Sequence, residues 1–257
     1  MCATCGCGES DVRVDGLVGS HAHEHGPEHV HEHVDAPAQD VVEIETALLA
    51  KNDHLAQHNR AWLAEHGIVS LNLMSSPGSG KTSLLERTIR EAPWDRSVSV
   101  IEGDQETFFD ADRIKATGAA VVQINTGSGC HLDADMLQRG LAALDPPEGS
   151  LLFVENVGNL VCPALFDLGE AAKVVVISVT EGDDKPLKYP HMFAAADLVV
   201  VNKTDLLPYV DFDLERCVRD ARSVNPGVTV LPLSVRCGDG MDAWYSWLDE
   251  LEAPHTY

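Results

Sequence analysis

The pattern of apolar positions divides the chain into a first segment without periodicity and a long region in which strands alternate with helices. From residue 68 onward, short apolar runs recur between turn residues and amphipathic stretches. Some of these runs, such as LLFV, KVVVIS and DLVVVN, are apolar at every position, which is typical of parallel strands buried on both faces. The pattern therefore predicts an α/β fold with a mostly parallel, doubly wound sheet of about seven strands.

Ahead of the sheet, residues 43–66 have helical spacing at Ile44, Leu48, Leu55 and Leu63, and Gly67 is a common helix stop. We expect this helix to pack on the edge of a domain that spans 41–257. The strands are expected near 68–74, 97–102, 119–124, 150–155, 173–179, 197–202 and 228–233, and the later helices near 81–91, 108–116, 132–144, 189–196, 212–224 and 240–251.

Residues 1–40 differ from the rest in composition. They hold three cysteines and six histidines together with glycine and proline, and they have no periodic apolar face. Such a segment cannot bury enough apolar surface to fold by itself, so we expect a flexible, metal-binding tail.

Charge and composition exclude some classes of binding partner and of cellular location. The 44% of hydrophobic residues supports a real core, whereas a net charge of −23 argues against binding nucleic acid or anionic lipid by general electrostatics. No run approaches the roughly 18 apolar residues of a membrane span, and the first residues lack the apolar core of a signal peptide. A cytoplasmic, reducing environment is expected, where clustered cysteines indicate metal or redox chemistry more than disulfides.

A phosphate-binding loop follows the first expected strand. Residues 75–82 read SSPGSGKT and lead into a helix, so backbone N–H groups and the helix N-terminus can surround phosphates. Lys81 would reach the β- and γ-phosphates, and Thr82 would bind Mg²⁺. Ser75 stands where the first glycine of the motif is usual, and a chance glycine-rich turn is the plain alternative. The loop predicts a P-loop NTPase fold.

Two further loops point to guanine. Asn202-Lys203-Thr204-Asp205 follows the strand DLVVV, and the Asp205 carboxylate can accept from the guanine N1–H and amino group, whereas adenine would leave it without a partner. A helix-initiating turn is the alternative reading of this tetrapeptide. Ser234, Val235 and Arg236 follow the last strand, where a supporting base loop is expected.

Acidic residues lie at the same edge of the sheet. Glu155 opens the segment ENVGN, which resembles a D-x-x-G switch with Gly158 near the γ-phosphate, and Asp104 follows another strand. Either carboxylate could order Mg²⁺ or the attacking water, although a solvated loop acid is the plain alternative. The nucleotide and Mg²⁺ site is therefore expected to comprise Gly78, Ser79, Gly80, Lys81, Thr82, Ser83, Asp104, Glu155, Gly158, Asn202, Lys203, Asp205, Ser234, Val235 and Arg236, with Lys81, Asp104 and Glu155 in catalytic roles.

Three groups of residues suggest transition-metal binding. Cys2, Cys5 and Cys7 can wrap one Ni²⁺ or Zn²⁺, and a redox C-x-x-C or an accidental cluster are the alternatives. A histidine tract is suited to loose Ni²⁺ or Zn²⁺ binding or storage, unless it is only a solvated linker; its members are His21, His23, His25, His29, His31 and His33.

The third group follows strands at the phosphate edge. Cys130 and His131 come after the strand at 119–124, and Cys162 comes seven residues after Glu155, so a metal held by all three would be tied to the γ-phosphate switch. Taken singly, a buried structural role is the favoured interpretation of either cysteine, and it is how we interpret Cys217 and Cys237.

Over nearly its whole length the chain resembles the hydrogenase nickel-incorporation GTPase family (HypB) of the SIMIBI class of P-loop GTPases. The resemblance is carried by MCATCGCG, LNLMSSPGSGKTSLL, VIEGDQET, INTGSGCHLDADM, VENVGNLVCPALFDLGE, VVVISVTEGDDKPLKYP, VVVNKTDLLP and SVRCGDGM. The SSPGSGKT form also occurs in that family.

The resemblance implies a GTP-hydrolysing nickel metallochaperone. Cys2, Cys5 and Cys7 match the family's N-terminal nickel site, and Cys130, His131 and Cys162 match its G-domain nickel or zinc site at a dimer interface. It further implies GTP/GDP, Mg²⁺, Ni²⁺ and Zn²⁺ as ligands, a nucleotide-dependent homodimer, a zinc-containing HypA-type accessory protein, and delivery of nickel to the [NiFe]-hydrogenase large subunit. A nickel store with secondary GTPase activity, and a chaperone for another metalloenzyme such as urease, remain as alternatives.

Overall fold

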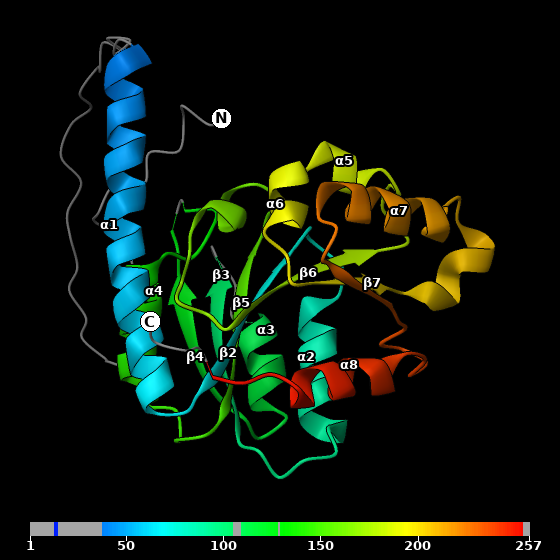
Figure 1. Ribbon diagram of the computed structural model, residues 1–257. Helices are drawn as coiled ribbons and strands as arrows, with labels where there is room; N and C mark the ends of the chain where they lie inside the picture. The colour runs from blue at the N-terminus through cyan, green and yellow to red at the C-terminus, as the bar shows by residue number, and fades with distance from the viewer. Residues whose placement is uncertain (1–12, 15–37, 105–108, 128, 254–257) are drawn as a thin grey trace, which may run out of the picture.

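A parallel β-sheet forms the centre of the molecule (Figure 1). The computed structural model describes residues 13–14, 38–104, 109–127 and 129–253. The sheet has the order β1-β4-β3-β5-β2-β6-β7-β8, and its strands are parallel apart from β1, which runs antiparallel to β4 at the edge. The strands are β1 (Arg13–Val14), β2 (Val69–Ser75), β3 (Val98–Asp104), β4 (Ala120–Asn125), β5 (Leu151–Gly158), β6 (Ala172–Ser178), β7 (Leu198–Asn202) and β8 (Thr229–Pro232).

Helices cover both faces of the sheet, so the expected doubly wound architecture is confirmed. Apolar side chains of α2, α3 and α8 pack on one face, and those of α1, α4, α6 and α7 pack on the other. The bounds are α1 (Ala38–Glu65), α2 (Lys81–Glu91), α3 (Phe109–Lys115), α4 (Ala134–Leu144), α5 (Lys185–Lys188), α6 (Pro190–Ala194), α7 (Leu214–Val224) and α8 (Met241–Asp249), with two 3₁₀ helices, η1 (Cys162–Leu165) and η2 (Thr204–Tyr209). Among the described helices, none has both the length and the apolar character to cross a bilayer.

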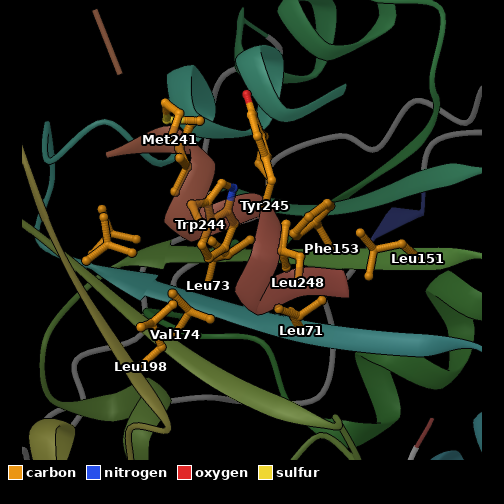
Figure 2. Packing of buried hydrophobic residues seen from close by; sticks show 14 of the residues in the cluster. Leu71, Leu73, Leu151, Phe153, Val174, Leu198, Met241, Trp244, Tyr245 and Leu248 are labelled. Atoms are coloured by element: carbon orange, nitrogen blue, oxygen red, sulfur yellow. The ribbon is translucent and has the colours of Figure 1, made fainter. Parts of the chain in front are cut away.

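The last helix, α8, seals one face of the sheet (Figure 2). Trp244 is completely buried over Phe153 of β5, with ring centroids 6.5 Å apart. Its indole N–H donates to the Thr88 hydroxyl of α2 at 2.9 Å, so the polar end of the ring is satisfied inside the core. The C-terminal helix thereby holds α2, which begins with the P-loop lysine, against the sheet.

Two of the observed helices and strands differ from those predicted from the sequence. The predicted helix at 189–196 is the shorter α6, and a second short helix, α5, comes before it. The two are separate because Pro190 lacks the N–H that would continue a helix from α5 and instead occupies the first turn of α6. Glu155 does not follow its strand but lies inside it, because β5 continues beside the P-loop as far as Gly158.

The N-terminal elements also depart from the prediction. The helix α1 begins at Ala38, five residues before the expected start at 43, and Leu48 is half exposed, so it is not part of the buried face. The edge strand β1 lies within the segment that was expected to be an unstructured tail.

We predict that Trp244→Ala lowers the free energy of unfolding by about 3–5 kcal/mol, because it leaves a large cavity and removes the N–H that donates to the buried Thr88 hydroxyl. Urea unfolding measures the change. Trp247→Ala, on the same helix but only partly buried, is the matched control and should cost clearly less. Equal losses in the two variants would show that α8 does not seal the core through Trp244.

Candidate functional site

The P-loop lies between β2 and α2 and is fastened to the loop after β7. Gly80 has a φ of +102°, and a Cβ at this position would lie 2.5 Å from the Asn202 side-chain nitrogen. That nitrogen donates to the Ser79 carbonyl at 2.9 Å, and Lys203 Nζ donates to the Gly78 carbonyl at 2.7 Å. Glycine is required here because the two loops touch at this point.

The expected base-reading residues converge at the end of β7. The Ser234 hydroxyl donates to Asp205 Oδ1 at 2.6 Å, and the Val235 N–H donates to Asn202 Oδ1 at 3.2 Å. Ser234 is fully buried and can fix the direction of the Asp205 carboxylate, whereas Arg236 is exposed. The arrangement holds a carboxylate where it can accept two hydrogen bonds from one edge of a base.

The triphosphate end of the site contains a buried lysine beside a buried carboxylate. Lys81 Nζ donates to Ser75 Oγ at 2.6 Å, so the serine in the position of the usual first glycine contacts the P-loop lysine. The Thr82 hydroxyl donates to Glu155 Oε1 at 2.7 Å. Burial lowers the pKa of Lys81 and raises the pKa of Glu155. An anion bound in the site would therefore favour the charged form of Lys81, and a cation would favour the charged form of Glu155.

This corner fits Mg²⁺. Among the described residues, Glu155 Oε2 is buried and makes no hydrogen bond, although its sister oxygen is bonded to Thr82. A hydroxyl and a carboxylate oxygen side by side are ligands that Mg²⁺ accepts together with phosphate oxygens. Asp104, the last residue of β3, lies two strand positions beyond Glu102, the register partner of Glu155. The Ser83 side chain accepts a hydrogen bond from Arg113 of α3 at 3.0 Å.

Sequence reasoning missed one acidic residue here. Glu102 of β3 is 2% exposed, lies opposite Glu155 in the register, and has a buried oxygen without a hydrogen bond among the described residues. Burial and the neighbouring Glu155 raise the pKa of Glu102 to about 8. A signal was present, because a glutamate within the apolar strand VSVIEGD is unusual for a strand covered on both faces.

The three predicted ligands of the second site lie together. The ligand atoms of Cys130, His131 and Cys162 are all within 4.8 Å of one another, and each residue is partly buried. Two thiols and an imidazole form a donor set for Ni²⁺ or Zn²⁺. Burial lowers the pKa of His131, which favours the neutral imidazole that a metal requires.

The loops that carry these ligands contact each other and the nucleotide site. The His131 ring stacks on Phe166 with centroids 4.0 Å apart, and the Asn159 amide donates to the Cys130 carbonyl at 3.4 Å. Gly158, directly before Asn159, lies against the P-loop, where a Cβ would be 3.2 Å from Pro77 Cα. A cleft of about 350 Å³ lies between these parts and is lined by Ser76, Pro77, Cys130, Val157, Gly158, Asn159, Leu160, Val161, Lys185 and Tyr189.

The other cysteines and histidines with predicted roles divide into two groups. Cys217 is buried in α7, and burial raises the pKa of its thiol to about 12, as expected of a structural cysteine; Cys237 is exposed. The thiols of Cys2, Cys5 and Cys7 and the histidine tract from His21 to His33 lie outside the described residues, so both sites stay predictions.

Comparison with known proteins gives a consistent set of relatives. Residues 69–232 match the family model "CobW/HypB/UreG, nucleotide-binding domain". The chain is 51% identical to the hydrogenase maturation factor HypB of Azotobacter vinelandii, over 97% of this chain and 92% of that protein, and 46% identical to that of Escherichia coli, over 97% and 98%. The crystal structure of HypB from Helicobacter pylori in complex with nickel is 36% identical, with a TM-score of 0.73 over 80% of this chain and all of that one.

We predict that Glu102→Gln stabilises the nucleotide-free protein more as the pH rises. The folded state holds a proton on Glu102 up to about pH 8, whereas the unfolded chain releases it near 4.5, so this contribution to stability is present below pH 4.5 and is lost as the pH rises through 8. Glutamine cannot ionise. Across that window the difference in unfolding free energy between variant and parent, measured in urea, should grow by about 1 kcal/mol or more.

The exposed loop residue Glu148 provides the control, since Glu148→Gln should leave the difference constant with pH. A pH-independent difference for Glu102→Gln would mean that Glu102 is ionised in the folded protein.

Proposed function

Because the chain belongs to the HypB family of hydrogenase maturation factors, we propose that it is a GTPase whose nucleotide state controls its hold on nickel. Its cargo would be Ni²⁺, bound by Cys130, His131 and Cys162 and delivered for [NiFe]-hydrogenase maturation in the cytoplasm. The observation that carries the proposal is the clustering of these three ligand atoms on two loops, one of which follows the strand that approaches the P-loop at Gly158.

GTP would be recognised at its two ends. Asp205, oriented by Ser234, accepts the hydrogen bonds that distinguish guanine from adenine. Lys81 neutralises the β- and γ-phosphates, and the backbone of the P-loop surrounds them. Thr82 and Glu155 would hold Mg²⁺, which would supply charge neutralisation for phosphoryl transfer, and Asp104 would orient water.

The coupling between the two sites follows the chain from Gly158 to Cys162. A γ-phosphate beside Gly158 would fix the backbone that approaches Pro77. Asn159 would transmit that position to Cys130 through its amide, and Cys162 begins the 3₁₀ helix three residues later. Hydrolysis would release this segment and change the separation of the metal ligands, as in other switches that respond to a γ-phosphate.

Partner proteins belong to the same proposal. Val161 and Leu165 are about half exposed on either side of Cys162, as expected of a surface covered in a nucleotide-dependent homodimer. Cys2, Cys5 and Cys7 would form a second, tighter nickel site. Nickel would then pass, together with a zinc-containing HypA-type accessory protein, to the hydrogenase large subunit.

We predict that the affinity of the Cys130 site for Ni²⁺ differs by about fivefold or more between GDP and a non-hydrolysable GTP analogue, the lower range of ordinary allosteric coupling. The full chain with Cys2, Cys5 and Cys7 changed to serine isolates this site, and absorbance of the thiolate–Ni²⁺ charge transfer reports binding. Lys81→Ala, which removes the phosphate contact, should abolish the difference.

Cys130→Ser in the same background should abolish the absorbance while GTP hydrolysis continues. Equal nickel affinity and equal oligomeric state with both nucleotides would contradict the proposed control by GTP.

A further inference from the structure

The long helix α1 lies across both loops that carry the candidate metal ligands, away from the nucleotide. We infer that Asn52 and Asn59 of α1 are positioning residues of the metal site, because they bridge the Cys130–His131 loop to the loop that follows Cys162. The inference rests on the proposed function in one respect, that Cys130, His131 and Cys162 hold the metal.

Asn52 makes one bond to the first residue of α4, where the Cys130–His131 loop ends, and one to the loop after Cys162. Its Oδ1 accepts from the Ala134 N–H at 2.9 Å, and its Nδ2 donates to the Asp167 carbonyl at 2.8 Å. Ala134 is three residues after His131, and Asp167 directly follows Phe166, on which His131 stacks. One amide side chain therefore links the backbones of two segments that are 33 residues apart in the chain.

Asn59 repeats the bridge two helical turns later. Its Nδ2 donates to the Ala134 carbonyl at 2.8 Å and to the Leu168 carbonyl at 3.1 Å. Between the two asparagines the helix backbone touches the second loop, since a Cβ on Gly169 would lie 2.4 Å from the Ala56 carbonyl oxygen. This close approach leaves the loop little freedom to move away from α1.

The bridges are inside the protein and cannot be replaced by water at little cost. Asn52 is 5% and Asn59 is 2% exposed, so removing either amide leaves buried backbone groups without partners. At the rim, Arg60 donates to both oxygens of Asp167 at 2.8 Å. Since His131 and Cys162 lie on different loops, the separation of those loops sets the separation of the ligands.

The test measures Ni²⁺ affinity in the full chain with Cys2, Cys5 and Cys7 changed to serine. We expect Asn59→Ala to weaken binding by about tenfold or more, the usual effect of removing a group that orients a metal ligand, and to reduce the thiolate–Ni²⁺ absorbance. Asn52→Ala, which removes the bonds to Ala134 and Asp167, should act in the same direction. GTP hydrolysis without nickel should persist, because neither asparagine lies at the nucleotide site.

Leu248→Ala is the control, since Leu248 of α8 is also buried but belongs to the core cluster on the opposite face of the sheet from α1. It should lower thermal stability and leave nickel affinity within about twofold of the parent, a change too small to indicate a displaced ligand. Equal losses of affinity in Leu248→Ala and Asn59→Ala, or unchanged affinity in both asparagine variants, would overturn the inference. If Cys130→Ser leaves nickel binding of the parent unchanged, the proposed site itself is wrong and the inference falls with it.

A second feature of α1 is independent of the metal loops. His54 and His58 are exposed and one helical turn apart, with ring centroids 4.7 Å apart and rings inclined at 69°. Among the described residues, neither ring makes a hydrogen bond, so their nitrogens are available. Two histidines at i and i+4 lie on one helix face and can bind the same ion. We propose that this pair binds a divalent transition ion such as Cu²⁺, Ni²⁺ or Zn²⁺, with water completing the coordination.

Cu²⁺ added to the full chain with Cys2, Cys5, Cys7 and Cys130 changed to serine and the six histidines of the tract changed to alanine tests this pair, because the paramagnetic ion broadens the amide resonances of nearby residues. We expect broadening centred on residues 54–58. His54→Ala and His58→Ala should each abolish it, since one imidazole alone does not chelate, and the double variant should add nothing further. His66→Ala is the control, as His66 directly follows the same helix and stacks on Trp62. Broadening that persists in the double variant, or is absent from the parent, would overturn the proposal.

Discussion

The parallel pairing of β2 with β5 is the contact on which both candidate sites depend. Leu73 lies opposite Glu155, and after an irregularity in the register Ser75 lies opposite Gly158. β2 leads into the P-loop, and β5 leads to Cys162. A slip of one residue in this pairing would turn Glu155 away from Thr82 and Gly158 away from Pro77. Both strands are buried along nearly their whole length, which holds the register, so core packing fixes the distance between the P-loop and the candidate metal ligands.

Buried asparagine side chains connect these strands to the loops that carry the candidate metal ligands. Asn156 of β5 donates to Asn72 of β2 at 3.1 Å and accepts from the Leu132 N–H, next to His131, at 2.9 Å. Asn72 donates to Glu170 at 3.3 Å, and Glu170 accepts from the Leu168 N–H at 2.7 Å. Polar groups inside a sheet are costly unless every partner is present, so this chain of bonds permits few arrangements of the two loops. The asparagines of α1 bond to the same loops from the other side.

Much of the fold and of the two candidate sites could be predicted from the sequence, for reasons that differ between elements. Fully apolar strands and a local motif such as GSGKT carry their own signal, and the edge rule for parallel sheets brought Cys130, His131 and Cys162 to one place. The buried face of α1 could not be predicted in this way. Apolar spacing selects Leu48, which is half exposed, and passes over Asn52 and Asn59. A polar residue on a helix is ordinarily interpreted as solvated, and only the carbonyl groups of a distant loop make burial favourable.

The number and burial of the candidate metal ligands are those expected of a transfer site more than of a structural one. Structural zinc sites use four protein ligands and are closed, whereas three ligands leave a coordination position for an incoming group. Here three partly buried side chains come from two loops, and the exposed Val161 and Leu165 lie beside them. An ion held in this way would remain accessible to a donor atom from a partner. Retention of the ion would then depend on the distance between the two loops. Gly158 and Asn159 contact these loops from one side and α1 from the other, so both would affect that distance.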